Sequence, residues 1–582
     1  MWVCYKTSQK TENANKRCGL TFFFLKCFEK EAILLVKNKI KKKSKEEVNN
    51  DKFTAPLQSL HSSLQLFSQP MLSPTWNPAI TQTMTTLPQS HNSIPNPGNG
   101  AVEHNHHAAK KPKLGHPISD SEIREEFSHH QRGVARINNG SFGSCPRSVL
   151  VAQSACQLRF LQQPDEFFFN VLRGGILESR ATVADLINAD HVDRVALVDN
   201  ATTAAAIVLQ QIGRRFVRGH FRREDSVIMF HCAYQAVKKS IEAYVTPIGG
   251  TIVEVQLPFP VRSDEEIVTE FKKGIEKGKL NGGRVRLAII DHITSMPSVV
   301  LPVRELIKIC REQGVEQIFV DGAHAIGSLP VDVKEIGADF YVSNLYKWFF
   351  SPPSVAFLYC KENSNDVHHP IVSQEYGKGL PVESAWVGMR DYSPQLVVPS
   401  ILEFVNRFEG GIEGIMQRNH DAVVKMGTML AESWGTILGS PPEMCASMIM
   451  VGLPSKLCVM CDDDALRLRS YLRVYHAIEV PVYYQVLRND DRDPRDKDGF
   501  ITGYVRISHQ VYNTVDDYQR LKTAINKLLE DGKICSGLPT EWFARREIKR
   551  YMFYSLLAGF GFWVRCIFSD ILFTCPLLFC IL

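Results

Sequence analysis

The feature that most constrains the fold is an alternation of short apolar runs with longer helical patterns between residues 194 and 360. Helical patterns such as 201–216 and 303–314 separate the runs. Strands that alternate with helices form βαβ units, so the sequence predicts an α/β fold in which helices flank a mainly parallel sheet. The predicted strands are 194–199, 226–231, 251–257, 286–291, 317–321, 340–343 and 355–360.

The composition and the apolar periodicity of the sequence divide the rest of the chain into segments. We expect a large domain with an N-terminal arm over residues 118–400, and a smaller α/β domain over 401–540. Residues 1–117 are rich in Lys, Ser, Gln, Asn and Pro without long apolar periodicity, and are interpreted as a disordered or mispredicted extension. Residues 541–582 form an apolar tail, either a membrane anchor or a mistranslated end. Each of its apolar runs is shorter than the roughly 18–20 residues that span a bilayer.

Composition narrows the classes of function. The formal net charge is +5 over 582 residues, which gives no basic field for nucleic acid. The 15 cysteines are scattered, and the single CxxC of Cys458 and Cys461 has no second pair, so no metal site is predicted. Sparse, irregular cysteines indicate a reduced intracellular chain. We expect a cytoplasmic protein, with plastid and mitochondrion left open, and membrane attachment only if the C-terminal tail is genuine.

Polar side chains follow the predicted strands, at the edge where ligands bind in an open α/β sheet. Thr202 and Thr203 open a helix and would bind an anion, although ordinary helix capping is the alternative. Tyr234 is either a stacking face for a ring or a core aromatic. Asp321 ends an apolar strand and needs a cationic partner, unless it is a turn residue before Gly322.

Lys347 lies in an aromatic and apolar run, between Tyr346 and Trp348. A buried lysine is costly unless its charge is used or removed. The alternative is a surface lysine with a buried stem, but its neighbours are poor surface residues. Pyridoxal 5'-phosphate would match this set of groups: an anion-binding helix start, a flat aromatic face, a carboxylate and a lysine. Its aldehyde binds a lysine, and its pyridinium nitrogen pairs with an acid.

The segment FVDGAHAIGSLPVDVKEIGADFYVSNLYKW resembles the class V aminotransferase superfamily of fold-type I pyridoxal-phosphate enzymes, and the resemblance covers about residues 118–530. The segments ARINNGSFGSCP, VDNATTA and VRISHQVYNT resemble its isopenicillin-N-epimerase-like branch. LAIIDHITSMPSVVLPVRELIKI and RDYSPQLVVPS are similar to the plant L-cysteine desulfhydrase family. Enzymes of that family are carbon–sulfur lyases of cysteine catabolism, which convert L-cysteine and water to hydrogen sulfide, ammonia and pyruvate. The resemblance thus implies such a lyase, as a homodimer.

The resemblance also implies roles for single residues. The cofactor would be bound by Lys347 as the Schiff-base lysine, Asp321 at the pyridinium nitrogen, His324 near the ring oxygen, Tyr234 on the ring face, and Thr202, Thr203 and Ser343 at the phosphate. The substrate would be bound by Arg506 at its carboxylate, with Asn139 and Gly140 alongside. Two positions depart from the family: Tyr346 replaces a histidine, and Met389 replaces a threonine that reaches a partner subunit's phosphate.

Other functions stay open. A cysteine desulfurase needs a nucleophilic cysteine on a mobile loop, and residues 361–393 contain no cysteine. Cys360 ends a predicted strand, which leaves the distant Cys445, Cys458 and Cys461. An amino-acid epimerase would use the same lysine and return the proton to the other face. From a different class, a catalytically impaired scaffold or regulatory homologue is suggested by Tyr346 and Met389.

Overall fold

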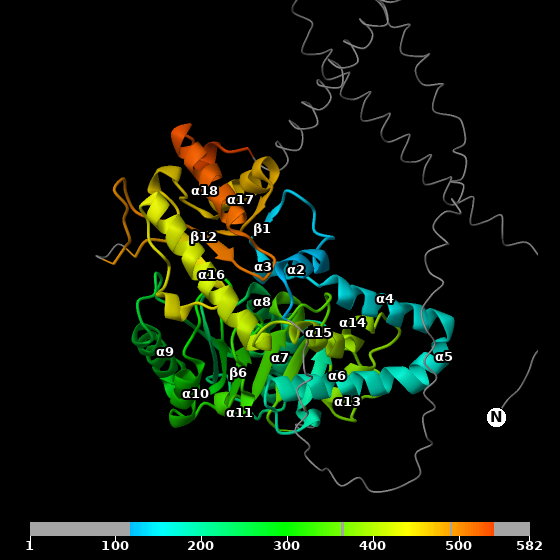
Figure 1. Ribbon diagram of the computed structural model, residues 1–582. Coiled ribbons are helices and arrows are strands. Elements are labelled where there is room, and N and C mark those ends of the chain that lie inside the picture. The colour runs from blue at the N-terminus through cyan, green and yellow to red at the C-terminus, as the bar shows by residue number, and fades with distance from the viewer. Residues whose placement is uncertain (1–116, 363–365, 489–491, 540–582) are drawn as a thin grey trace, which may run out of the picture. The chain divides into compact units, whose positions relative to one another are not determined.

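The computed structural model describes residues 117–362, 366–488 and 492–539 (Figure 1). The predicted extension up to residue 116 and the apolar tail 541–582 lie outside the described residues. Within the described part, none of the helices combines the length and the apolar character that crossing a bilayer requires.

The centre of the fold is a seven-stranded sheet of order β2-β8-β7-β6-β5-β3-β4. Neighbours from β4 to β7 pair in parallel, whereas β8 runs antiparallel to both β2 and β7. The mainly parallel α/β sheet predicted from the apolar runs is therefore confirmed. The strands are β2 (Val195–Val198), β3 (Ser226–Phe230), β4 (Thr251–Val255), β5 (Val285–Asp291), β6 (Gln317–Asp321), β7 (Phe340–Asn344) and β8 (Ala356–Cys360).

Helices cover both faces of this sheet. Val227 and Met229 of β3 pack with α7 (Ala201–Val217) and α8 (Gln235–Tyr244). The alternate residues of the same strand pack with helices of the opposite face, α9 (Asp264–Gly278) and α10 (Val303–Glu312), which lie side by side in Figure 1. Because both faces are buried, the strands are continuous apolar runs rather than alternating ones.

The segment before the sheet forms an arm of helices. Ser119 caps its first helix through a capping box with Glu122. The helices are α2 (Asp120–Glu126), α3 (Asn139–Phe142), α4 (Arg147–Gln162), α5 (Pro164–Glu166) and α6 (Arg173–Leu186). Short helices that follow the later strands are α11 (Val333–Ile336), α12 (Leu345–Trp348), α13 (Leu380–Ala385), α14 (Ser393–Leu396) and α15 (Val398–Val405).

A second core lies around a three-stranded antiparallel sheet of order β11-β12-β9. In Figure 1, α17 and α18 lie together beside it, and the long α16 runs past it. Its elements are α16 (Gly411–Trp434), β9 (Met448–Gly452), α17 (Asp462–His476), β11 (Val482–Tyr484), β12 (Gly503–Ser508) and α18 (Val515–Glu530). The domain boundary expected near residue 400 stays a prediction.

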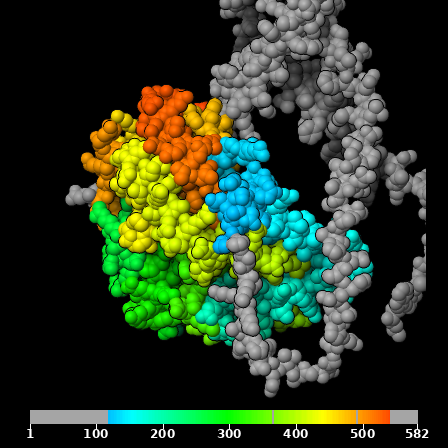
Figure 2. Space-filling model, viewed as in Figure 1, coloured from blue at the N-terminus to red at the C-terminus, as the bar shows by residue number. Residues whose placement is uncertain are grey.

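The N-terminal arm joins this second core. β1 (Ala135–Arg136) pairs in parallel with β10 (Ile478–Glu479), and the Ala135 N–H donates to the Ala477 carbonyl oxygen at 2.9 Å. Figure 2 shows the same relation on the surface, where the blue N-terminal segment lies against the orange C-terminal elements. Residues that follow β1 in the chain are thereby held next to β12.

Candidate active site

A cavity of about 230 Å³ lies at the carboxyl ends of the parallel strands, where the sequence predicted a ligand. Three separate parts of the chain meet there: the arm after β1, the strand ends of the large sheet and the turn after β7. The residues around the cavity include Gly140, Ser141, Phe142, Thr202, Tyr234, Asp291, Ser295, Asp321, His324, Asn344, Tyr346 and Lys347.

Lys347 lies on α12, the single helical turn that follows β7. Its Nζ lies 3.1 Å from the Nε2 of His324. Burial lowers the pKa of the Lys347 amine to about 8, with a further lowering by Arg506, and Asp321 opposes both. The apolar run around this lysine in the sequence accounts for its burial, and burial brings the pKa of the amine close to ordinary pH, so that a minor share is neutral.

Two glycines fix the turn that carries Lys347. Gly143 has φ +63, and a Cβ on it would lie 1.8 Å from the Tyr346 carbonyl oxygen. Gly327 has φ +80, and a Cβ there would lie 2.6 Å from the Trp348 carbonyl oxygen. Only glycine permits both the left-handed backbone and the close approach. The arm and the loop after β6 therefore hold the lysine turn from two sides.

Asp321 and His324 lie on the same side of the cavity as the lysine. The Asp321 carboxyl is 5% exposed, and it accepts from the Ala323 N–H at 3.0 Å. Burial raises its pKa, while the Ala323 N–H and the charge of Lys347 lower it. Burial and the charge of Lys347 hold the pKa of His324 well below its usual value, so its imidazole is neutral. The His324 Nδ1 has no hydrogen-bond partner in the described part of the chain.

The start of α7 forms the polar end of the cavity. The Ala201 N–H donates to the Oδ1 of Asn344 at 2.9 Å, and the Thr203 N–H donates to the Oδ1 of Asn200 at 3.0 Å. The intervening Thr202 lines the cavity, and the described residues provide no acceptor for its N–H or hydroxyl. A helix of 17 residues thus presents free donors there, as an anion requires.

Two residues predicted to bind the phosphate, Thr203 and Ser343, do not line the cavity. Thr203 is occupied in capping the helix, and it does not line the cavity. Ser343 is fully buried, where its hydroxyl accepts from the Ile326 N–H at 3.0 Å and donates to the Gly322 carbonyl oxygen. Both contacts order the walls of the site, and the phosphate roles of these two residues stay predictions.

Arg506, on β12, faces the cavity region from the second core. It is 2% exposed, and its Nη atoms donate to neutral oxygens of Ser295, Asn138 and Ser141 at 2.8–3.3 Å. Burial lowers its pKa to about 10, with a further contribution from Arg469. No carboxylate among the described residues pairs with it, and its Nε has no partner. A buried guanidinium without a counter-ion is suited to a ligand carboxylate.

The arm residues divide into cavity wall and scaffold. Asn139 faces away from the cavity: its Nδ2 donates to the Oδ1 of Asn513, and its Oδ1 accepts from the Tyr512 hydroxyl, each at 2.8 Å. Gly140 lines the cavity, and a Cβ on it would lie 2.3 Å from the Met448 Sδ. The predicted substrate contact through the Asn139 side chain therefore has no support from this geometry.

Sequence reasoning assigned no role to several residues of the site. Asn138 and Ser141 hold Arg506, and Asp291 lines the cavity beside Asp321. Ser295 binds the same guanidinium through its carbonyl oxygen and hydroxyl. The only signal for the arm residues was their position beside Asn139 and Gly140, because nothing in the sequence places this arm next to β12.

The residues of this cavity fit pyridoxal phosphate. Thr202 offers free donors to an anion, Asp321 offers a buried carboxylate to a protonated ring nitrogen, and Lys347 offers to an aldehyde an amine whose pKa is lowered to about 8. Tyr234 is 53% exposed, which is unusual for a wall residue unless a second ring covers it. Across the described residues, no cluster of His, Cys, Asp and Glu has the arrangement of a metal site.

Of the two residues that depart from the family pattern, Tyr346 lines the cavity and Met389 does not. Tyr346 lines the cavity, and burial raises the pKa of its phenol to about 12, so it is neutral. Met389 is 70% exposed and does not line the cavity. It precedes Arg390, which forms an ion pair with Asp199 just before α7.

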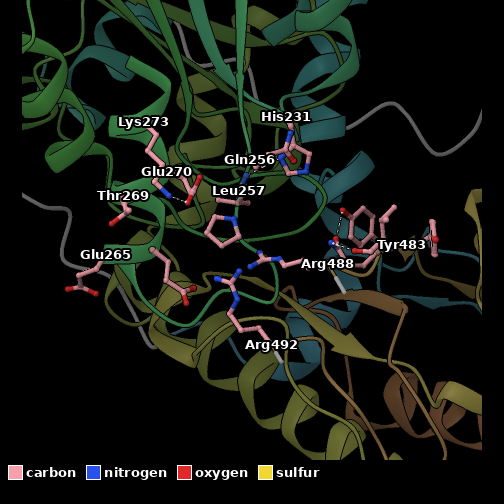
Figure 3. A pocket seen from close by; sticks show the side chains of 15 residues that line it. His231, Gln256, Leu257, Glu265, Thr269, Glu270, Lys273, Tyr483, Arg488 and Arg492 are labelled. Carbon is pink, nitrogen blue, oxygen red and sulfur yellow. Dashed lines mark hydrogen bonds and ion pairs between the residues drawn. The ribbon is translucent and has the colours of Figure 1, made fainter. Parts of the chain in front are cut away.

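A larger hollow of about 870 Å³ lies elsewhere, between α9 and the residues that follow β11 (Figure 3). Charged side chains surround it, among them Glu270 and Lys273, which pair at 2.8 Å. None of the predicted site residues lines it. The volume of a cavity therefore does not identify the active site in this fold. The smaller cavity is the candidate because reactive side chains converge on it.

Comparison with known proteins gives a consistent result. The family model described as aminotransferase class-V matches residues 173–374. The chain is 66% identical over 442 residues to L-cysteine desulfhydrase of Arabidopsis thaliana, which covers 75% of this chain and 97% of the relative. It is 26% identical to isopenicillin N epimerase of Streptomyces clavuligerus over 68% of this chain and 95% of that protein.

Among solved structures, the fold is similar to a variant of C-DES that carries glycine covalently linked to its PLP cofactor. The TM-score is 0.53 at 17% identity, over 69% of this chain and 98% of that one. At this identity the likeness concerns the fold, and it agrees with the fold-type I architecture expected from the sequence.

Proposed function

The chain belongs to the class V aminotransferase family of pyridoxal-phosphate enzymes, and from this premise we propose that it is an L-cysteine desulfhydrase. The reaction is a carbon–sulfur lyase reaction: L-cysteine and water give hydrogen sulfide, ammonia and pyruvate. The observation that carries the proposal is that Lys347 and Asp321 line one cavity whose wall residues Ser141 and Ser295 accept hydrogen bonds from Arg506, in a chain 66% identical to a curated enzyme of this name.

Pyridoxal phosphate, when bound, supplies an electron sink for the substrate's α-carbon. The protein residues position and move charge around it. Arg506 binds the substrate carboxylate, for which its planar guanidinium is suited. Asp321 would hold the negative charge that keeps a ring nitrogen protonated, and Tyr234 would lie against the ring. The Lys347 amine, neutral above a pKa of about 8, accepts the α-proton, after which the β-carbon loses its sulfur as sulfide.

The residues around Lys347 favour loss of sulfide over its capture by the protein. A desulfurase transfers sulfur to a cysteine thiolate, and residues 361–393 contain no cysteine. Cys360 is buried at the end of β8, and burial raises the pKa of its thiol to about 12. Thiols that are held protonated are poor nucleophiles.

Product analysis with purified protein and L-cysteine tests the proposal. We expect sulfide and pyruvate in equal amounts, with ammonia. Sulfide accompanied by alanine would establish a desulfurase, and D-cysteine would establish an epimerase. A protein that binds no cofactor and forms none of these products would be a scaffold or regulatory homologue, as Tyr346 and Met389 allow.

We also propose that the protein is a homodimer in which the partner completes the cofactor site. Met389 is exposed and does not line the cavity of its own chain, and the family resemblance implies that this position reaches a partner's phosphate. The helical arm exposes apolar side chains that a monomer would leave in water: Val151, Leu158, Leu161, Phe169 and Leu177. Sedimentation at micromolar concentration should give a dimer. A fully active monomer would contradict this. We also propose a cytoplasmic location, which rests on the sparse and irregular cysteines of the sequence.

A further inference from the structure

Two buried carboxyl groups lie side by side at the end of the central sheet. Asp291 ends β5 and Asp321 ends β6, and the two residues are direct partners in the parallel register. Registered residues of adjacent parallel strands point to the same face, about 5 Å apart. Both line the cavity, and they are 4% and 5% exposed. Two neighbouring carboxylates in such a place cannot both keep a negative charge without large cost.

The surroundings of the two groups differ. Asp321 accepts the Ala323 N–H at 3.0 Å and lies within the electrostatic reach of the Lys347 amine. The Asp291 Oδ2 has no hydrogen-bond partner in the described part of the chain. Hydrogen-bond donors and cations stabilise a carboxylate, so a negative charge costs less free energy on Asp321 than on Asp291.

The other ionisable groups around Asp291 do not change the preference for a negative charge on Asp321. They are Asp321 on β6, Cys232 after β3 and Lys238 on α8. The one cation among them, Lys238, also lies 3.5 Å from the Oε2 of Glu254, and it lowers the pKa of Asp291 less than burial and the charge of Asp321 raise it. The Cys232 thiol is held protonated by burial, with its pKa well above the usual value.

We propose that Asp291 is a positioning residue that stays a neutral carboxylic acid, so that the single negative charge of the pair rests on Asp321. A neutral but polar neighbour solvates the Asp321 carboxylate inside the protein, where an apolar neighbour would not. Burial and the charge of Asp321 both raise the pKa of Asp291, in agreement with this assignment. The consequence for catalysis rests on the proposed function, whereas the charge assignment itself does not.

The first experiment measures the proton directly, in the cofactor-free full-length protein. Infrared difference spectra at neutral pH should contain the carbonyl band of a protonated carboxylic acid that Asp291→Asn removes. Absence of any such difference band between wild type and variant would overturn the proposal. Neither the reaction nor its substrate enters this measurement, so its failure is separate from failure of the proposed function.

The second experiment compares two near-isosteric variants with pyridoxal phosphate as the probe. Asp291→Asn keeps a neutral polar group, so cofactor affinity should fall by less than about threefold. Asp291→Leu removes the polar neighbour and should raise the pKa of Asp321, which moves the acid limb of cofactor binding toward higher pH, by roughly tenfold in proton concentration. A purely structural role would lower affinity without moving that limb.

An Asn variant that is as defective as the Leu variant would show that the ionised form of Asp291 is required, and would overturn the proposal. Should the Leu variant fail to fold, judged by its circular dichroism and melting curve, the infrared comparison and the Asn variant decide the question alone.

Discussion

The Nζ of Lys347 lies 3.1 Å from the Nε2 of His324, so the closest polar partner of the reactive amine is a neutral imidazole rather than a carboxylate. Burial lowers the pKa values of both groups, that of Lys347 to about 8. A carboxylate at this distance would hold the lysine fully protonated and unreactive. Asp321 acts from further away and opposes the lowering only in part.

The first prediction concerns the loading of apo-protein with pyridoxal phosphate. The neutral amine reacts with an aldehyde and the protonated amine does not, so the rate should rise with pH through a midpoint near 8. Asp321→Asn removes the charge that favours the protonated form, and should move the midpoint to lower pH. Stopped-flow absorbance follows the reaction. A rate independent of pH between about 6 and 9, or a midpoint that rises in the variant, would contradict this account.

The second prediction concerns the lysine itself. Lys347→Ala should remove the visible absorption band of the lysine-bound cofactor and abolish sulfide release, since no other amine faces the cavity among its described lining residues. Lys308→Ala is the control, because that side chain is 75% exposed on α10. Spectra and a sulfide assay on both variants check the prediction. A wild-type protein without the band would favour the scaffold function instead.

The third prediction concerns the glycine clamp of the lysine turn. Gly143→Ala should lower the free energy of unfolding by about 3 kcal/mol or more, because left-handed strain adds to a clash with the Tyr346 carbonyl oxygen. Gly133→Ala is a matched control, since Gly133 has φ +77 but nothing within 4 Å of a Cβ. It should cost only about 1–2 kcal/mol. Urea unfolding measures the free energy of unfolding of both variants. Equal losses would contradict the role of Gly143 in holding the lysine turn.

The fourth prediction concerns recognition of the substrate carboxylate. Arg506→Gln should lower kcat/KM for L-cysteine by roughly 10–150-fold, the range of ~1.5–3 kcal/mol for hydrogen bonds to a charged group. Cysteamine lacks the carboxylate, so wild type and variant should process it equally poorly. Ser141→Ala removes only one acceptor of the guanidinium and should change kcat/KM far less. A variant equally impaired toward both compounds would mean that Arg506 is structural.

The fifth prediction separates sulfide release from sulfur transfer. Cys360→Ala should leave sulfide and pyruvate formation within about twofold of wild type, because the buried thiol does not line the cavity. Mass spectrometry after turnover without reductant should find no persulfide on the protein. A persulfide on any cysteine, with alanine as the product, would replace the lyase by a desulfurase.

Local sequence was sufficient for the strands, the polar groups at their ends and the fold class. The apolar runs that end in Asp321 and Asn344 are buried on both faces, which leaves no ambiguity about their structure. Parallel strands end at the same edge of a sheet, so Lys347 and Asp321 could be assigned to one edge.

Tertiary structure decided the long-range parts of the site. Asn138 and Ser141 meet Arg506 across more than 360 positions of sequence, and that contact depends on β1 pairing with β10. Periodicity carries no information about such pairing. For the same reason the sequence could not show that Asn139 binds Asn513, or that Asp291, the last residue of a predicted strand, lies beside Asp321. The charge state of a buried carboxyl depends on its neighbours in space, which only the packed sheet brings together.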